Sequence, residues 1–279
     1  TVNSTGLTET QKVDYFGRQA GETDFGGHVN TYTFNLAGEL ASFTNSSNAG
    51  APETYSYFNT GLLASQGTVT SGTYAGYDYT SSTAETYADD ANGNRTSEAN
   101  GTTLTVTGLG TQTTLSHTAT TTYDAMNRMT SFTDTGTNGN QGTTAIPPAT
   151  VTWEYDLNGN IRHMVGTYYA LDSQGNISTT SSTQDYWYKY DALNRFVTTM
   201  GTFTGTRGSG TISRGTTGQD ITYDLAGNRA TSTDNASGTT TYTYTADGRV
   251  DQVKIAGVLR ADYTYDAMGR VTDYKEYAT

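Results

Sequence analysis

Residues 265–271 read Tyr265-Asp266-Ala267-Met268-Gly269-Arg270-Val271, and this heptad decides how the chain folds. An Asp at the first position of a turn accepts a hydrogen bond from the backbone two residues on, and Gly tolerates a left-handed backbone. The residues before it alternate as Tyr263-Thr264-Tyr265, and a period of two places both rings on one face of a strand. The heptad therefore predicts a β-hairpin made by a type I turn and a left-handed residue that forms a bulge.

The heptad recurs along the chain. Full or nearly full copies begin at six tyrosines, and degenerate copies surround positions 14, 35, 58 and 90. The position that Asp holds falls at residues 14, 35, 58, 90, 124, 156, 191, 224, 245 and 266, which makes about ten copies. The intervals are 21 or 23 residues near both ends and 32–35 residues between them. Because the extra residues are mostly Thr, Ser and Gly, we expect them to form loops or extra strand length.

Two sets of residues should therefore have structural roles. Asn stands in place of Gly at Asn127 and Asn194, and Asn also tolerates the left-handed conformation. The turn residues that we expect are Asp14, Gly17, Asn35, Gly38, Gly61, Asp90, Gly93, Asp124, Asn127, Asp156, Gly159, Asp191, Asn194, Asp224, Gly227, Gly248, Asp266 and Gly269. The structural aromatic residues that we expect are Tyr123, Tyr155, Tyr190, Tyr223, Tyr244 and Tyr265.

The composition predicts an all-β protein. Hydrophobic residues make up 33% and charged residues 15% of the 279 residues, yet there are 22 Tyr. Tyr and Thr favour pleated, half-buried surfaces, whereas disordered chains are poor in aromatic residues. Since a lone hairpin is marginally stable, the hairpins should stack into one continuous array over residues 1–279. We expect loops at 138–148 and 205–218, and we expect the chain to be a fragment of a longer protein.

Several classes of function are disfavoured. A net charge of −12 argues against nucleic acid as a partner, because phosphate binding needs clustered Lys and Arg. The absence of Cys excludes disulfides, zinc–thiolate sites and cysteine nucleophiles. No stretch approaches the roughly 20 apolar residues of a membrane span.

No catalytic, cofactor-binding or metal-binding residue is predicted. The three histidines, His28, His117 and His163, have no recognised ligand spacing. The sequences at 90–94 and 156–160 faintly suggest calcium loops, but their Gly is misplaced and the Glu at position twelve is missing. No Gly-x-Ser-x-Gly elbow occurs, and Glu is scarce for a carboxylate pair. We therefore expect no enzyme activity and no cofactor.

The repeated Tyr-Asp-x-x-Gly-Arg sequence, spread over nearly the whole chain, resembles the Rhs/YD-repeat family. That family includes bacterial Rhs proteins, insecticidal toxin-complex cocoon subunits and teneurin-type shells. The resemblance implies a spiral sheet around a hollow interior, either a wall that encapsulates a C-terminal toxin or an extracellular recognition shell. The chain departs from the pattern at Phe58 and Thr245, which replace Asp, and at Val13 and Asp89, which replace Tyr.

Three functions are left open. The first is a non-catalytic scaffold, a wall of a large secreted or cell-surface bacterial protein that encapsulates or presents a toxin or binding domain. The second is a subunit of an extracellular filament or adhesin assembled through repeat edges. For the fold, we expect the hairpins to coil into a spiral sheet or an open solenoid-like array. The third is a carbohydrate-binding module that stacks sugars on tyrosine. The expected partners are flanking parts of the same polypeptide, neighbouring subunits, an enclosed toxin or a surface glycan, outside the cell.

Overall fold

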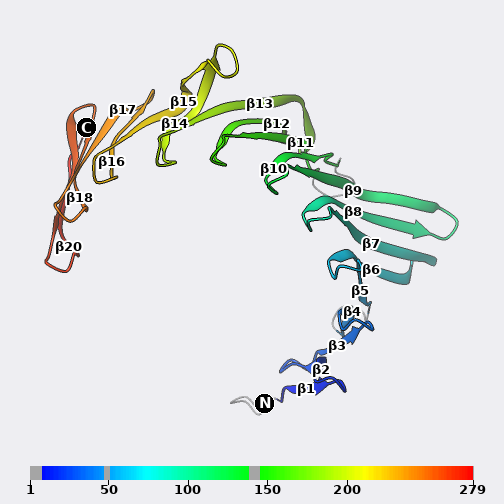
Figure 1. Ribbon diagram of the computed structural model, residues 1–279. Coiled ribbons are helices and arrows are strands. Elements are labelled where there is room, and N and C mark those ends of the chain that lie inside the picture. The colour runs from blue at the N-terminus through cyan, green and yellow to red at the C-terminus, as the bar shows by residue number, and fades with distance from the viewer. Residues whose placement is uncertain (1–7, 47–50, 138–144, 279) are drawn as a thin grey trace. The chain divides into compact units, whose positions relative to one another are not determined.

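The structure of the protein is a computed structural model that describes residues 8–46, 51–137 and 145–278. It confirms the all-β fold, because 20 strands form one sheet of antiparallel hairpins (Figure 1). In chain order they are β1 (Thr10–Val13), β2 (Gln19–Thr23), β3 (Val29–Phe34), β4 (Leu40–Asn45), β5 (Glu53–Tyr57), β6 (Leu63–Tyr74), β7 (Tyr77–Asp89), β8 (Arg95–Val106), β9 (Gly110–Tyr123), β10 (Met129–Asp134), β11 (Ala149–Tyr155), β12 (Ile161–Leu171), β13 (Ile177–Tyr190), β14 (Phe196–Thr204), β15 (Thr211–Tyr223), β16 (Arg229–Asp234), β17 (Gly238–Tyr244), β18 (Val250–Ile255), β19 (Val258–Tyr265) and β20 (Val271–Glu276). The described segments contain no helix, and so no helix that could span a membrane.

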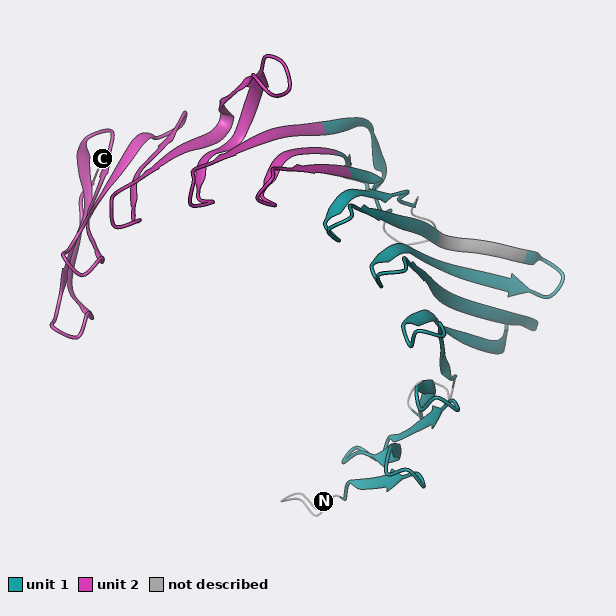
Figure 2. Ribbon diagram, viewed as in Figure 1, with its two compact units in different colours: residues 1–150, 167–182 teal, residues 151–166, 183–279 magenta. Residues whose placement is uncertain are grey.

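The chain separates into two compact units (Figure 2). Unit 1 comprises residues 1–150 and 167–182, and unit 2 comprises residues 151–166 and 183–279. Within each unit, consecutive strands pair antiparallel, as β7 with β8 in unit 1 and β15 with β16 in unit 2. The single continuous array over residues 1–279 stays a prediction.

The turns that contain the Tyr-Asp motif, which we call YD turns, connect each odd-numbered strand to the next even-numbered strand. Since the strands of a unit run back and forth, its YD turns lie at one edge of the sheet and the other turns lie at the opposite edge (Figure 1). The motif tyrosine pairs with the residue six positions later, as Tyr223 with Arg229 and Tyr265 with Val271, and the register shifts at both tyrosines. This shift is the bulge that the sequence predicts.

Each motif aspartate closes its turn with both carboxylate oxygens. In the turn at Asp191, Oδ1 accepts hydrogen bonds from the backbone N–H of Leu193 at 2.9 Å and of Arg195 at 3.0 Å. Oδ2 accepts a hydrogen bond from Arg195 Nε at 2.8 Å. The N–H of Asn194 donates to the Asp191 carbonyl at 3.1 Å, and Asn194 has a φ of 60°. The same carboxylate-to-backbone bonds occur at Asp14, Asp90, Asp124, Asp156 and Asp266.

Three of the ten turns have another residue in place of Asp, namely Asn35, Phe58 and Thr245. They show which hydrogen bonds of the turn form without a carboxylate. Asn35 uses its amide oxygen to accept from Ala37 and Glu39, and its amide group donates to the Glu39 carboxylate at 2.7 Å. At the Thr245 turn, the hydroxyl accepts from the backbone N–H of Arg249 at 3.1 Å. At Phe58 no side-chain acceptor exists, and the backbone bonds of the turn form alone. The backbone geometry is therefore common to all ten turns, and the fourth residue has a positive φ in each.

The extra residues of the longer repeats form mostly strand. Strands β6 to β9 of unit 1 have 12–14 residues. Residues 138–144 of one predicted loop lie outside the described residues. The other predicted loop, 205–218, is wrong from Thr211 onward, where β15 begins. A Cβ at Gly215 or Gly218 would clash with the carbonyl oxygen of Met200, so these glycines allow two strands to approach closely.

The two faces of the sheet differ in chemistry. Rings pair across strands on one face, as Tyr32 with Phe43 at 5.2 Å and Tyr263 with Tyr274 at 5.0 Å between centroids. Hydroxyl groups pair across strands on the other, as Thr222 with Thr231 at 2.7 Å. No large side chain is fully buried among the described residues, and the motif tyrosines are half-buried. Burial therefore comes from contacts between adjacent hairpins.

The turn carboxylates should make the protein sensitive to acid. Hydrogen bonds from the side chain and the backbone of Arg195 hold the pKa of Asp191 below its ordinary value of 3.8. A lowered folded-state pKa contributes stability that is present above the unfolded-state value and is lost as the pH falls through the folded-state value. Asp191→Asn keeps the Oδ1 acceptor and removes the charge. We expect its loss of stability relative to wild type, measured by urea denaturation, to be largest near neutral pH and to shrink below about pH 4. A constant difference down to pH 2 would contradict this role for the carboxylate.

Candidate functional site

The motif tyrosines bind the repeat that precedes them. Each of five hydroxyls donates a hydrogen bond to the carbonyl of the residue five positions after the preceding motif aspartate or its equivalent. The pairs are Tyr123 with Arg95 at 2.9 Å, Tyr190 with Ile161 at 3.0 Å, Tyr223 with Phe196 at 3.0 Å, Tyr244 with Arg229 at 2.8 Å and Tyr265 with Val250 at 2.7 Å. Burial raises the pKa of the Tyr190 hydroxyl to about 12, which extends the pH range over which it can donate this hydrogen bond. The sixth motif tyrosine, Tyr155, ends β11 and is half-buried.

The motif arginines link one turn to the next. Arg18 bonds its own aspartate through Nε at 2.7 Å, and its guanidinium lies 4.2 Å from the ring centre of Phe34 in the next repeat. Arg195 lies 4.1 Å from the ring centre of Tyr223, and Arg249 lies 5.5 Å from that of Tyr265. These three arginines therefore each add a cation–π contact to the aromatic residue that precedes the next turn.

Two pairs of turns are joined by asparagine side chains. In unit 2, the amide groups of Asn158 and Asn160 donate to Asn194 Oδ1 at 3.1 and 3.0 Å. In unit 1, Asn92 and Asn94 donate to Asn127 Oδ1 at 3.1 and 2.9 Å. We call this arrangement the asparagine fork. Asn replaces Gly at the fourth turn position in these two turns, and both follow an Asp-x-Asn-Gly-Asn turn.

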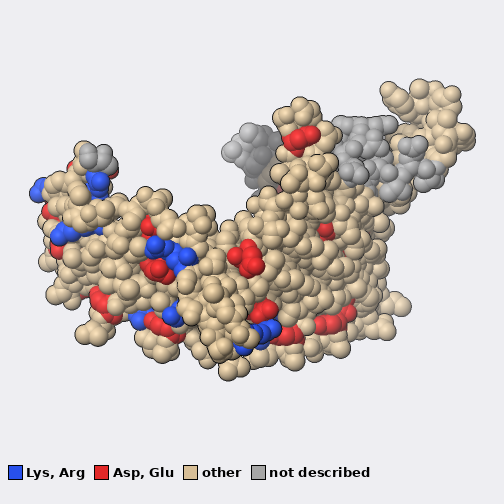
Figure 3. Space-filling view, turned by 90° about the horizontal axis from the view of Figure 1, so that it is seen from above, with Lys and Arg blue, Asp and Glu red and all other residues tan. Residues whose placement is uncertain are grey.

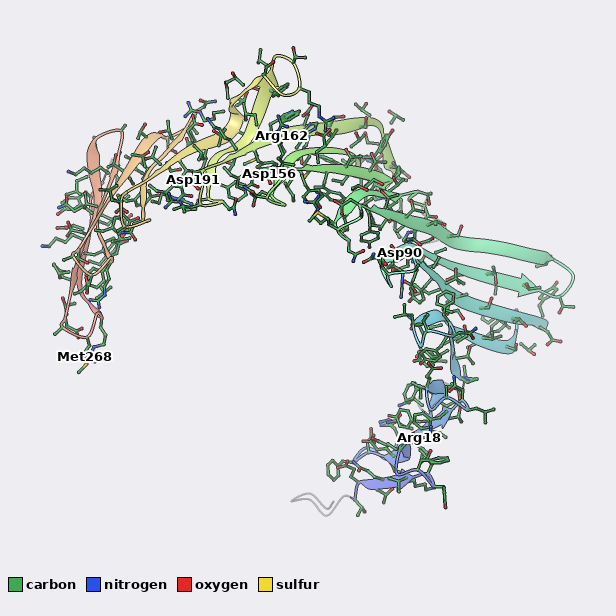
Figure 4. The ribbon with its side chains drawn as sticks, in the orientation of Figure 1. Arg18, Asp90, Asp156, Arg162, Asp191 and Met268 are labelled. Carbon is green, nitrogen blue, oxygen red and sulfur yellow. The ribbon has the colours of Figure 1, made fainter. Side chains whose placement is uncertain are left out.

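Apolar side chains project from the tips of the YD turns. Leu36 of unit 1 and Leu157 and Leu225 of unit 2 are fully exposed. Met268 is 80% exposed at the tip of its turn (Figure 4). The tip residues are Tyr15, Phe16, Leu36 and Met126 in unit 1, and Leu157, Leu193, Leu225 and Met268 in unit 2. Single exposed apolar side chains are normal on protein surfaces, and these stand out because they recur at the tips of YD turns in both units.

A second apolar surface lies at the opposite edge of unit 1, where the long strands β6 to β9 turn. Tyr74 is 80% exposed there and Leu109 is 71% exposed. A hollow of about 530 Å³ is lined by Tyr74, Ala75, Tyr77, Tyr79, Leu104, Val106 and Leu109. Such a surface fits an apolar partner better than a charged one.

A row of polar side chains crosses four strands of unit 1. Gln66, Glu85, Asn100 and His117 are successive cross-strand neighbours. Gln66 donates to Glu85 at 2.5 Å, Asn100 bonds His117 at 2.7 Å, and His117 Nδ1 lies 3.2 Å from Asp134. The row lines a hollow of about 280 Å³. The row satisfies Gln66, Glu85 and Asn100, whereas the buried His117 Nδ1 has no hydrogen-bond partner among the described residues and lies 3.2 Å from an Asp134 oxygen.

The other histidines also pair with carboxylates. His28 bonds Asp24 at 2.9 Å within one turn. His163 bonds Asp185 at 2.8 Å and stacks on Trp187 with 4.0 Å between ring centres. Within the described part of the chain, no group of three His, Asp or Glu could hold a metal ion.

The two calcium-like sequences lie in YD turns. The carboxylates of Asp90 and Asp156 accept hydrogen bonds from their own turns, so their oxygens are already engaged. On the face that Figure 3 shows, basic and acidic residues are interspersed and most of the surface is uncharged.

Sequence reasoning missed three features of these contacts. Turns at Asp24 and Asp172 have the same carboxylate geometry at the other edge of the sheet. Their Asp-x-x-Gly sequences are visible at 24–27 and 172–175, but no tyrosine precedes them. The tyrosine hydroxyl bonds and the asparagine fork were also missed. The fork has a signal in the sequence. Both turns that have Asn instead of Gly at the fourth position, at Asn127 and Asn194, come directly after an Asp-x-Asn-Gly-Asn turn.

Removing one inter-repeat hydroxyl should weaken unit 2. Tyr223→Phe keeps the ring but removes the donor to the Phe196 carbonyl, so we expect a loss of about 1 kcal/mol in the free energy of unfolding. The matched control is Tyr242→Phe, since the Tyr242 hydroxyl makes no hydrogen bond to any described residue. Urea denaturation of both variants measures the difference. Equal losses would show that the hydroxyl bond does not join the repeats.

The asparagine fork predicts energetic coupling between two turns. Asn158→Ala removes a donor, and Asn194→Gly removes the acceptor while keeping a residue that tolerates a positive φ. A double-mutant cycle should give a coupling of about 0.5–1 kcal/mol in the free energy of unfolding. The control cycle combines Asn158→Ala with Asn127→Gly in the other unit. Additivity in both cycles would rule out the fork as a link.

No protein-family model and no curated protein matches the chain. Among solved structures, the chain is similar to one from the Photorhabdus luminescens Tc holotoxin pore, with a TM-score of 0.27 and 11% sequence identity. The match covers 96% of this chain and 18% of that chain.

Proposed function

We propose that the chain is a non-catalytic structural scaffold, part of the wall of a large secreted or cell-surface bacterial protein. The wall would enclose or present a toxin or a binding domain, and its partners would be flanking parts of the same polypeptide or neighbouring subunits. One observation carries the proposal: the motif side chains are used to join successive hairpins. In unit 2, Tyr223, Tyr244 and Tyr265 each bind the preceding repeat.

The chemistry of the motif supports a structural role over a catalytic one. The aspartates accept hydrogen bonds from their own turns, which lowers their pKa instead of raising it as a general acid at neutral pH requires. The arginines that could bind an anion are paired with these aspartates, as Arg128 is with Asp124 at 2.6 Å. The resemblance of the repeated motif to the Rhs/YD-repeat family agrees with this assignment.

The apolar surfaces support a role in assembly. The tip residues and the Tyr74–Leu109 surface lie at opposite edges of unit 1, where adjoining polypeptide could cover them. The tip residues lie between strands, whereas the Tyr74–Leu109 surface includes cross-strand neighbours such as Tyr79 and Val106.

A filament subunit is the second candidate, and the exposure of β20 favours it. All six residues of β20 are exposed, and the strand pairs only with β19 among the described strands. An unpaired strand edge can template pairing with another chain.

Negative-stain electron microscopy and sedimentation separate the two candidates. The scaffold predicts discrete particles of the purified chain, whereas the filament predicts fibres that lengthen with protein concentration. The variant Leu157→Ser/Leu193→Ser/Leu225→Ser is the control, because these exposed tip residues contribute little to folding. Fibres formed by both proteins would contradict the scaffold and point to assembly through strand edges. Fibres abolished by the three substitutions would instead indicate assembly through the turns.

A further inference from the structure

Each asparagine fork contains one bond between an Asn and a Gly. The bonds are Asn92–Gly93 in unit 1 and Asn158–Gly159 in unit 2, and they lie in the YD turns that begin at Asp90 and Asp156 (Figure 4). Both asparagines are exposed, so water reaches them. An Asn that precedes Gly is chemically labile, because Gly has no side chain to keep its backbone nitrogen away from the Asn side-chain carbonyl carbon. These two bonds are therefore places where the forks can change covalently.

The reaction open to such a bond is an intramolecular deamidation. The Gly backbone nitrogen loses its proton and attacks the Asn Cγ, so that a C–N bond forms and the side-chain amide leaves as ammonia. The product is a cyclic succinimide. Water then opens either ring carbonyl and leaves aspartate or isoaspartate. Overall, water is consumed and ammonia is released in equal amounts, and no atom changes its oxidation state.

The turn itself holds the attacking nitrogen. The N–H of Gly159 donates a hydrogen bond to the Asp156 carbonyl at 3.1 Å, and the N–H of Gly93 donates to the Asp90 carbonyl at 3.0 Å. A nitrogen whose proton is held in this way is a poor nucleophile, since it must lose that proton before it attacks. Ring closure therefore requires the turn to open.

The fork holds the other reacting group. Asn158 Nδ2 donates to Asn194 Oδ1 at 3.1 Å, and Asn92 Nδ2 donates to Asn127 Oδ1 at 3.1 Å. The amide that would leave is therefore bound to the following repeat and is not free to swing toward its own Gly. Deamidation of either Asn thus requires the fork to open as well as the turn.

The second donor of each fork lacks this lability. Asn94 precedes Arg95, and Asn160 precedes Ile161. A large side chain after the Asn hinders the approach of the backbone nitrogen to Cγ. Only the first donor of each fork therefore combines a labile bond with a contact to the next repeat.

We propose that Asn92 and Asn158 are deamidation sites that their forks protect, so that each reacts only when its own pair of repeats opens. Proteins open locally without unfolding as a whole. A reaction that needs such an open state follows its population when opening and closing are fast. The rate of deamidation at each Asn therefore reports how often that fork is open.

The modification makes an opening permanent. An ionised carboxylate only accepts hydrogen bonds, and the atom that it would face, Oδ1 of Asn127 or Asn194, is an acceptor too. Isoaspartate also adds a carbon atom to the main chain of the turn. Neither product can make the bond that the amide made, so each deamidation removes this part of the link between two repeats.

Peptide mass spectrometry of the full chain, incubated at mildly alkaline pH, measures deamidation at each site. Asn194→Gly removes the acceptor in unit 2 and keeps a residue that tolerates a positive φ. We expect it to speed deamidation of Asn158 about fivefold, as the loss of a single hydrogen bond implies, and to leave the rate at Asn92 unchanged. Asn127→Gly should give the opposite pattern, so each variant contains its own matched control.

A sample unfolded in urea gives the unprotected rate at both sites. Deamidation that is no slower in the folded chain than in urea would overturn the proposal. Equal rates in the wild type and in the variant that lacks the acceptor would also overturn it. Acceleration of both sites by one variant would do the same, because general loosening of the chain would then control the reaction in place of the fork.

A product mimic gives an independent readout. Asn158→Asp replaces the amide donor by a carboxylate, so it should lower the urea midpoint of the wild type more than that of Asn194→Gly, in which the acceptor is already absent. Equal shifts in the two backgrounds would show that deamidation does not act through the fork.

Discussion

The structure depends on the contact between one hairpin and the tyrosine of the next. No large side chain is fully buried among the described residues, so no hairpin has a core of its own. Five of the six motif tyrosines instead donate their hydroxyl to the backbone of the preceding repeat, as Tyr244 does to the Arg229 carbonyl. The stability of such an array comes from nearest-neighbour interfaces, and a hairpin in isolation is marginal.

The aspartate and arginine of the motif support this contact from the turn. The carboxylate fixes the backbone of its turn and orients the arginine, which then lies over the next ring; Asp191, Arg195 and Tyr223 are one such series. The motif arginine thus makes contacts in two repeats, with the aspartate of its own turn and with the ring of the next repeat. This explains why a chain with only 15% charged residues places so many of its arginines beside motif aspartates.

The sequence predicts the turns well because their chemistry is local. Asp266, Gly269 and Asn194 act within four residues, and the sign of φ follows from the residue type. The contacts between repeats span 15–36 residues, so they need the register of the sheet, which the pattern alone does not supply. The Gly-rich segment 205–218 misled the prediction for a related reason. Gly215 and Gly218 serve close packing against Met200, and sequence does not distinguish this use from a loop.

The asparagine fork has a consequence for how the gene could change in length. A repeat joined only by tyrosine and arginine carries a complete set of contacts, so duplication or loss of one such repeat leaves its neighbours compatible. The fork differs, because Asn158 and Asn160 serve an acceptor in the following repeat, at Asn194. Recombination between these two repeats would separate the donors, Asn158 and Asn160, from the acceptor, Asn194. In this part of the array the unit whose contacts are complete is therefore a pair of repeats, and a second such pair occurs at Asn92–Asn127.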